Sequence, residues 1–139
     1  MLLEGNLQGL QHLGLPTADI NTTKTWYQEV LGFETVHEAV LQEHGGETKV
    51  AFLKLDNLII ETYQQPEHVR KEAGIDKDGY VEHIALNVRD VDAAFKEITA
   101  AGIEVLEGAP RFLPFWDNGV RFFTIRGPNR EKIEFNQYL

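Results

Sequence analysis

The feature that most restricts how this chain can fold is a segment that occurs twice, once in each half of the sequence. Residues 80–88 form a short apolar stretch with one histidine, His83, and Asp90 then opens an amphipathic helical pattern. Residues 10–17 carry His12 and are likewise followed by a helical pattern that opens at an aspartate, with an offset of 71 residues between the two histidines. An internal repeat of this length constrains the fold before any single motif does, so we expect two copies of one structural unit.

Apolar periodicity, helix-capping residues and turn residues predict the same order of elements in both halves: a strand, a helix and three strands. In the first half the predicted elements are a strand at 8–15, a helix at 20–31 and strands at 33–41, 49–55 and 58–63. In the second half they are a strand at 80–88, a helix from 90 to about 101 and strands at 103–106, 120–125 and 132–136. Most of the connections are short, so the strands should pair mainly antiparallel, and the expected fold class is α+β.

The length of 139 residues suits one domain, residues 1–139, built from two modules. Module one is expected at about 7–65 and module two at about 80–139. Residues 66–79 are polar and contain both proline and glycine, and this change in composition predicts a linker between the modules.

Composition excludes several classes of function. The formal net charge is −9 and no run of basic residues occurs, which argues against a nucleic-acid-binding protein because phosphate contacts need clustered Lys and Arg. The chain has no cysteine, so disulfides, cysteine nucleophiles and thiolate metal sites are excluded. The sequence shows no secretory signal and no apolar run long enough to span a membrane, and we therefore expect a cytoplasmic protein.

Four side chains occupy matching places in the two modules. His12 and His83 lie in the first predicted strand of each module, and Glu61 and Glu134 lie in the last. A symmetric repeat places equivalent side chains on equivalent faces, and an enclosed carboxylate is costly unless it is paired, hydrogen-bonded or bound to a cation. A single histidine in a strand is more often a hydrogen-bonded core residue, but this symmetric set predicts a site for Zn²⁺, Ni²⁺, Co²⁺, Fe²⁺ or Mn²⁺. The remaining histidines are expected to be solvated: His37, His44 and His68.

Several segments resemble one known family. The residues His12-Leu13-Gly14-Leu15 with 26–33, then 82–88 and 127–135, are similar to proteins of the vicinal oxygen chelate superfamily. That superfamily contains glyoxalase I, methylmalonyl-CoA epimerase, fosfomycin-resistance enzymes, bleomycin-binding proteins and extradiol dioxygenases. The resemblance covers nearly the whole chain. It implies two tandem βαβββ modules that form a curved, mixed, mostly antiparallel sheet around a metal-binding cleft.

The set His12, Glu61, His83 and Glu134 resembles the ligand set of bacterial glyoxalase I, a lactoylglutathione lyase. Epimerases of the superfamily usually have Gln at the position of Glu61, and bleomycin-binding members generally lack the ligands. The resemblance therefore implies a metal-dependent lyase or isomerase with one divalent ion per site, Zn²⁺ or Ni²⁺ foremost. In such an enzyme the metal polarises a carbonyl and stabilises an enediolate, Glu134 moves the neighbouring proton, and Glu61 lies across the site. The reaction would convert a hemithioacetal of glutathione and methylglyoxal into a lactoyl thioester.

Two departures from glyoxalase I leave the substrate open. Pro16 stands where an Arg usually helps to hold glutathione, and the loop at 111–119 is long and aromatic, suited either to a bulkier substrate or to a hydrophobic contact. The alternatives are another enzyme of the superfamily, such as an epimerase or thiol transferase, or a metal-free protein that binds a small molecule. The resemblance also implies a homodimer, and the four ligands could come from one chain or from two.

Overall fold

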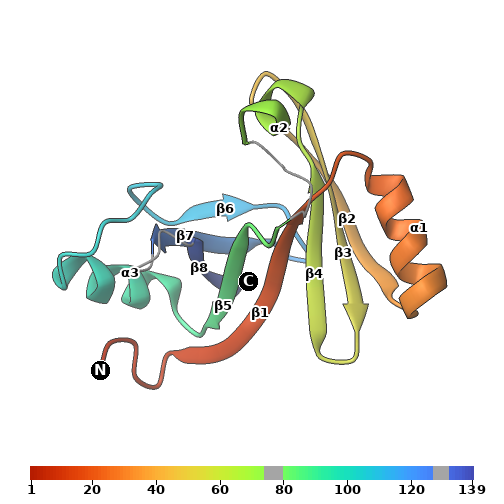
Figure 1. Ribbon diagram of the computed structural model, residues 1–139. Helices are drawn as coiled ribbons and strands as arrows, with labels where there is room; N and C mark the ends of the chain where they lie inside the picture. The colour runs from red at the N-terminus through yellow and green to blue at the C-terminus, as the bar shows by residue number, and fades with distance from the viewer. Residues whose placement is uncertain (74–79, 127–131) are drawn as a thin grey trace. The chain divides into compact units, whose positions relative to one another are not determined.

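The computed structural model describes residues 1–73, 80–126 and 132–139, and Figure 1 shows its elements. The first half of the chain contains β1 (Leu7–Pro16), α1 (Ile20–Leu31), β2 (Glu34–Glu43), β3 (Gly46–Leu55), β4 (Leu58–Gln64) and α2 (Glu67–Ala73). The second half contains β5 (His83–Val88), α3 (Val91–Ala100), β6 (Arg111–Leu113), β7 (Val120–Arg126) and β8 (Lys132–Tyr138). Within the described residues, no helix has both the length and the apolar character needed to cross a membrane.

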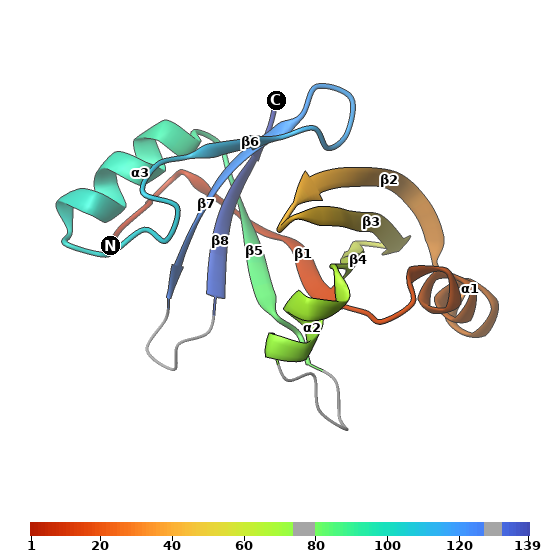
Figure 2. The same ribbon diagram turned by 90° about the horizontal axis from the view of Figure 1, so that it is seen from above.

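The chain divides into two compact units, and the division falls within β1. The first unit joins Met1–His12 to His83–Leu139, and its strand order is β1-β5-β8-β7-β6. The second unit is Leu13–Glu82, with the strand order β2-β3-β4-β1. In Figure 2 the strands of each unit can be followed side by side in these orders. The expected α+β fold, with a strand, a helix and three strands in each half, is confirmed. The assignment of residues 1–139 to one domain stays a prediction.

Each module contains a parallel strand pair, and the register of this pair is the same in both modules. In the second unit β1 runs parallel to β4, and Gly14 is opposite Glu61. In the first unit β5 runs parallel to β8, and Ala85 is opposite Glu134. Gly14 and Ala85 each stand two residues after a histidine in their strands, so both glutamates hold the same place relative to the repeated segment. The other paired strands with a described register are antiparallel.

Helix α1 begins and ends where the sequence predicted. The carboxylate of Asp19 accepts hydrogen bonds from the backbone N–H groups of Asn21 and Thr22, which satisfies two donors that the first helical turn leaves unpaired. Gly32 follows the helix with φ of 76°, the left-handed conformation that glycine adopts without strain. Phe33, Leu53 and Ile60 form a small apolar cluster in this unit, and Tyr27 of α1 packs against it.

Helix α3 is packed more deeply than α1. Val91, Ala94 and Ile98 are buried in one cluster with Phe123 and Phe135 of the sheet. The N-terminal segment joins this cluster through Leu3, which is 3% exposed. Asn6 holds the entry of the helix, because its side chain accepts from the N–H of Asp90 and donates to the Asp90 carbonyl oxygen. The first residues of the chain therefore belong structurally with the second half.

One predicted strand is wrong, and the predicted linker contains a helix. Residues 103–106 do not form a strand. Ile103 and Val105 are partly buried and pack against the α3 cluster. The strand that was predicted at 103–106 is replaced by β6, which lies inside the predicted loop. The predicted linker at 66–79 contains the helix α2, whose residues are mostly good helix formers. Residues 74–79 of that linker, and the turn at 127–130 quoted for the family resemblance, lie outside the described residues.

Candidate functional site

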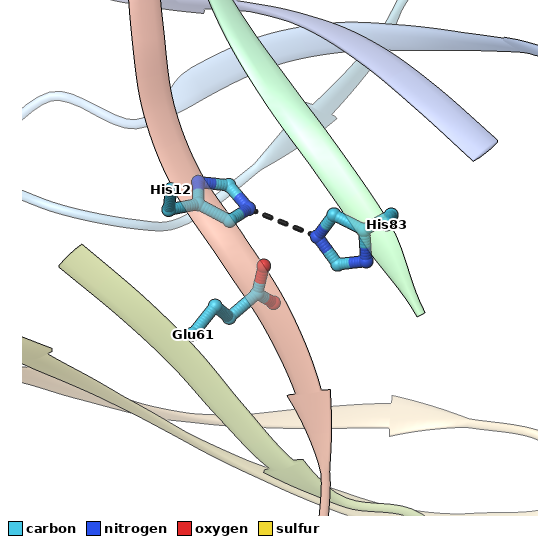
Figure 3. Close-up of side chains that lie close together, drawn as sticks. All are labelled: His12, Glu61 and His83. Carbon is cyan, nitrogen blue, oxygen red and sulfur yellow. Dashed lines mark hydrogen bonds between the residues drawn. The ribbon is translucent and has the colours of Figure 1, made fainter. Parts of the chain in front are cut away.

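The two repeated histidines face each other in the first unit. The Nε2 atoms of His12 and His83 are 3.0 Å apart, as the dashed line in Figure 3 marks. Their rings are nearly perpendicular, with an interplanar angle of 86°. His12 is 2% exposed and His83 9% exposed, so both imidazoles are withdrawn from bulk solvent.

Glu134 of β8 lies beside this pair. Its Oε1 atom is 4.0 Å from Nε2 of His12, and its side chain is 13% exposed. Three of the four predicted ligands, His12, His83 and Glu134, therefore come together within one unit of one chain. The sequence left open whether ligands from the two halves meet in one chain or across a dimer, and for these three residues one chain is sufficient.

A chain of buried amide side chains connects the two ends of this group. The Nδ2 amide of Asn136 donates to Glu134 Oε1 at 2.6 Å, and Gln11 Nε2 donates to Asn136 Oδ1 at 3.1 Å. Gln11 Nε2 also donates to Asn87 Oδ1 at 3.1 Å. The Oε1 atom of Gln11 lies 3.1 Å from Nδ1 of His12. Gln11 is 6% exposed and Asn136 2% exposed, and buried polar groups of this kind are stabilised when every donor and acceptor has a partner.

Glu61, the fourth predicted ligand, lies in β4 of the second unit, where it is partly buried and opposite Phe52 of β3. Its neighbour two residues on, Tyr63, is 8% exposed and donates its hydroxyl to Glu82 Oε2 at 3.1 Å. Burial raises the pKa of the Tyr63 phenol, and the negative charge of Glu82 raises it further. Tyr63 is therefore a neutral donor over the physiological pH range.

The other histidines differ from one another. His44 and His68 are exposed, in agreement with their predicted solvation. His37 is instead half-buried, with its ring centroid 6.0 Å from that of Phe52, so its predicted solvation was wrong. The register explains this burial, because His37 is opposite Phe52 and Phe52 is opposite Glu61, which puts the three side chains on one face of the sheet.

The aromatic loop is partly internal. Phe115 is 3% exposed, and Trp116 packs edge-on against Tyr138 with 5.8 Å between the ring centroids. Trp116 has φ of 63°, which is unusual for a bulky residue. Phe112 is 58% exposed. Phe115 is therefore buried in the interior of the first unit, as a hydrophobic contact by this loop would require.

The donor set in the first unit fits a divalent ion. Two nitrogen atoms bound at about 2.1 Å to one ion and at a right angle to each other lie roughly 3.0 Å apart, and zinc–imidazole bonds have about this length. The Nε2 atoms of His12 and His83 have that separation, and a carboxylate of Glu134 is adjacent. Neutral imidazole and carboxylate suit Zn²⁺, Ni²⁺, Co²⁺, Fe²⁺ and Mn²⁺. This group is therefore a possible His/Glu metal site.

Sequence reasoning missed the amide residues around the histidines. The signal for two of them was present, because side chains alternate along a strand. The alternation that puts Glu134 on the inner face puts Asn136 there as well, and Asn87 follows His83 by four residues. Gln11 carried no comparable signal, since it precedes His12 directly and its burial depends on the course of β1.

Comparisons with known proteins identify the family of this chain. Residues 9–135 match the family model described as Glyoxalase/Bleomycin resistance protein/Dioxygenase superfamily. The chain is 30% identical over 128 residues to the uncharacterized protein YwbC of Bacillus subtilis (strain 168), covering 92% of this chain and 96% of that protein.

Similar solved structures include methylmalonyl-CoA epimerases. The enzyme from Mycobacterium tuberculosis has a TM-score of 0.81 and 24% identity, covering 100% of this chain and 93% of the other. A variant of the Streptomyces coelicolor enzyme in complex with 2-nitronate-propionyl-CoA has a TM-score of 0.76 and 25% identity, covering 94% and 97%. At these identities the likeness establishes mainly the fold.

Proposed function

The chain belongs to the Glyoxalase/Bleomycin resistance protein/Dioxygenase superfamily, and on that premise we propose that it is a metal-dependent enzyme that moves a proton next to a carbonyl group. The observation that carries the proposal is the grouping of His12, His83 and Glu134 in one unit of one chain. Two buried imidazoles with facing Nε2 atoms and an adjacent carboxylate form the donor set of a catalytic divalent-metal site. Glu61 is proposed as the fourth ligand from its matching place in the repeat.

Each residue has a separate role in this proposal. A bound divalent ion would supply Lewis acidity that makes a proton next to the substrate carbonyl easier to remove. His12 and His83 hold the ion through Nε2. Glu134 takes the proton on its carboxylate and returns it, and the N–H of Asn136 at 2.6 Å keeps that carboxylate oriented.

The first candidate reaction is the glyoxalase I type, in which a proton moves between two neighbouring carbon atoms of a hemithioacetal. The carboxylate at position 61 supports it, because the resemblance associates Glu there with bacterial glyoxalase I and Gln there with epimerases. Pro16, in place of the expected Arg, argues for a thiol other than glutathione or for a different contact with it.

The second candidate is an epimerase that removes a proton from one face of a single carbon atom next to a thioester carbonyl, after which a proton is delivered to the opposite face. The similarity to structures of methylmalonyl-CoA epimerase favours it, including one in complex with 2-nitronate-propionyl-CoA. Both candidates use the same metal site and the same base, so they differ in substrate rather than in the first chemical step.

Two measurements test the proposal. Metal content of the purified protein, determined together with its mass in solution, should give one divalent ion per site and a homodimer. Activity should then be measured with Zn²⁺ and with Ni²⁺ on the glutathione–methylglyoxal hemithioacetal, and as uptake of deuterium from solvent into methylmalonyl-CoA. Turnover of the first substrate supports the lyase, and exchange in the second supports the epimerase. A protein that binds no divalent ion and is unaffected by a chelator would overturn both enzyme candidates and leave a metal-free binding protein.

A further inference from the structure

The hydrogen-bond chain between Glu134 and His12 has only one possible direction. A carboxylate can only accept, so the Asn136 amide must present its N–H group to Glu134 and its oxygen to Gln11. Gln11 must then present its N–H group to Asn136, which leaves its oxygen toward His12. That oxygen can only accept, so His12 donates from Nδ1–H. One ionised carboxylate thereby sets the orientation of both amides and the proton position on a histidine of another strand.

We propose that Gln11 and Asn136 are positioning residues that hold His12 in the Nδ1–H tautomer and so present an unprotonated Nε2 atom to a metal ion. The proposal deepens the proposed function and rests on it for the identity of the ligand. In neutral imidazole only one ring nitrogen carries a proton, so a proton fixed on Nδ1 leaves the lone pair on Nε2. Partners of this kind orient metal-bound imidazoles and raise their basicity.

The second amide proton of Gln11 makes the arrangement stiffer. It is directed to Asn87 Oδ1 at 3.1 Å, and the Asn87 amide in turn donates to Gln8 Oε1 at 2.8 Å. Gln11 therefore has both N–H groups and its oxygen engaged, and turning its amide over would break three hydrogen bonds at once. In a buried setting each broken bond leaves an unsatisfied polar group. This cost holds the His12 proton on Nδ1.

The lone pair on Nε2 of His12 also determines where His83 carries its proton in the metal-free protein. Because Nε2 of His12 carries a lone pair, the 3.0 Å contact between the two histidines requires His83 to donate from Nε2–H. The two histidines then have opposite tautomers. Binding of a metal ion to both Nε2 atoms must displace the proton from Nε2 of His83, whereas His12 keeps its proton on Nδ1.

The test uses the whole protein with ¹⁵N-labelled histidine, because the nitrogen chemical shift distinguishes a protonated from an unprotonated ring nitrogen. Without metal, wild type should show His12 as Nδ1–H and His83 as Nε2–H. Addition of Zn²⁺ should move the proton of His83 and leave that of His12 in place. Finding His12 as Nε2–H in the metal-free wild-type protein would overturn the proposal, and this result does not depend on whether the protein is an enzyme.

Three variants separate positioning from general loss of stability. Gln11→Leu should release the His12 tautomer and weaken Zn²⁺ binding by about 10- to 100-fold in competition with a chelator, the usual effect of removing a partner of a metal ligand. Gln11→Glu can still accept from Nδ1–H, so it should keep the tautomer while losing the donor to Asn136. Gln42→Leu removes an exposed glutamine and should change neither property. If Gln11→Leu, folded by its circular dichroism, keeps both the wild-type tautomer and the wild-type affinity, Gln11 is not a positioning residue.

The outcomes also distinguish this proposal from the proposed function. If wild type binds no divalent ion, the proposed function fails, but the tautomers of the metal-free protein still decide whether Gln11 and Asn136 hold His12. If wild type binds Zn²⁺ and the tautomers differ from those assigned, the positioning role fails and the metal site stands.

Discussion

The two modules place their glutamates in the same register and then support them differently. Glu61 is opposite Gly14, and Glu134 is opposite Ala85, so each acid stands at the same point relative to the repeated segment. Two residues further along the strand, module two has Asn136, which donates to Glu134 itself. The equivalent residue of module one is Tyr63, which donates to Glu82. Symmetry of the backbone thus does not imply symmetry of the hydrogen bonds that orient the acid.

The helices of the two modules also differ, because α3 is packed more closely against its sheet than α1. Helix α3 buries Val91, Ala94 and Ile98 against the sheet, and the N-terminal segment adds Leu3 to that cluster. Helix α1 leaves Val30 58% exposed and contributes Tyr27 to a smaller cluster. Of these two described clusters, the larger one lies in the unit that contains His12, His83 and Glu134, which suits residues that must keep a defined geometry.

The largest expected effect separates the two glutamates. Glu134→Gln should lower turnover at least about 100-fold on whichever proposed substrate the wild-type protein uses, because the amide cannot accept a proton. Binding of Zn²⁺ should weaken less, since the amide oxygen remains a possible ligand. Glu61→Gln should be milder, because the family resemblance implies Gln at this place in epimerases. The measurements are kcat on protein of known metal content and chelator competition. Equal losses of turnover and metal affinity in Glu134→Gln would argue against its role as the base.

The next prediction compares two valines on the two helices. Val91 is fully buried and Val30 is 58% exposed. Val91→Ala should lower the free energy of unfolding by about 2 kcal/mol, from lost burial of two methyl groups and the cavity left behind. Val30→Ala should change it by less than about 0.5 kcal/mol. Urea unfolding of both variants measures the difference, and similar costs would show that the helices are packed alike.

Tyr63 should contribute a stabilisation of similar size that depends on pH. Tyr63→Phe removes a hydrogen bond to a charged group and should cost about 1.5 to 3 kcal/mol at pH 7. Folding raises the pKa of this phenol, so its contribution is fully present below the ordinary tyrosine pKa of about 10 and is lost as the pH rises further. Wild type should therefore lose up to about 1.4 kcal/mol per pH unit above 10 relative to the variant. A difference between the two proteins that stays constant to pH 11 would contradict this.

The smallest expected effect concerns the cap of α1. The backbone N–H of Thr22 donates to Asp19 and lowers the pKa of its carboxyl below the ordinary value. The ionised cap therefore stabilises the fold above the unfolded-state pKa near 3.8, and this contribution is lost as the pH falls through the lower pKa of the folded state. Asp19→Asn keeps a capping oxygen without the charge, so its melting temperature should be lower than that of wild type at pH 7 and should approach it in acid. Asp56→Asn, in an exposed hairpin turn, controls for removal of one negative charge.

Local patterns were sufficient for most elements and failed where pairing partners decide. The helix at 20–31 was predicted to the residue, because its Asp cap and terminal glycine act within a few residues. The alternation at 103–106 looked like a strand, yet these residues are not assigned to one. Ile103 and Val105 pack against the α3 cluster, and the N–H of Leu106 donates to the Thr124 carbonyl oxygen of β7. The helix α2 was missed because proline and polar residues in its neighbourhood indicated a linker.

By itself the sequence determined the two βαβββ modules, their order, and the matching places of His12, His83, Glu61 and Glu134. Those features follow from periodicity and repetition, which are local or can be compared between the halves. Only the tertiary structure decided that Met1–His12 joins the second half and that Gln11 links Asn136 to His12. These contacts join residues that are far apart in the chain, and the direction of each hydrogen bond depends on the next donor or acceptor. No spacing within the sequence contains that information.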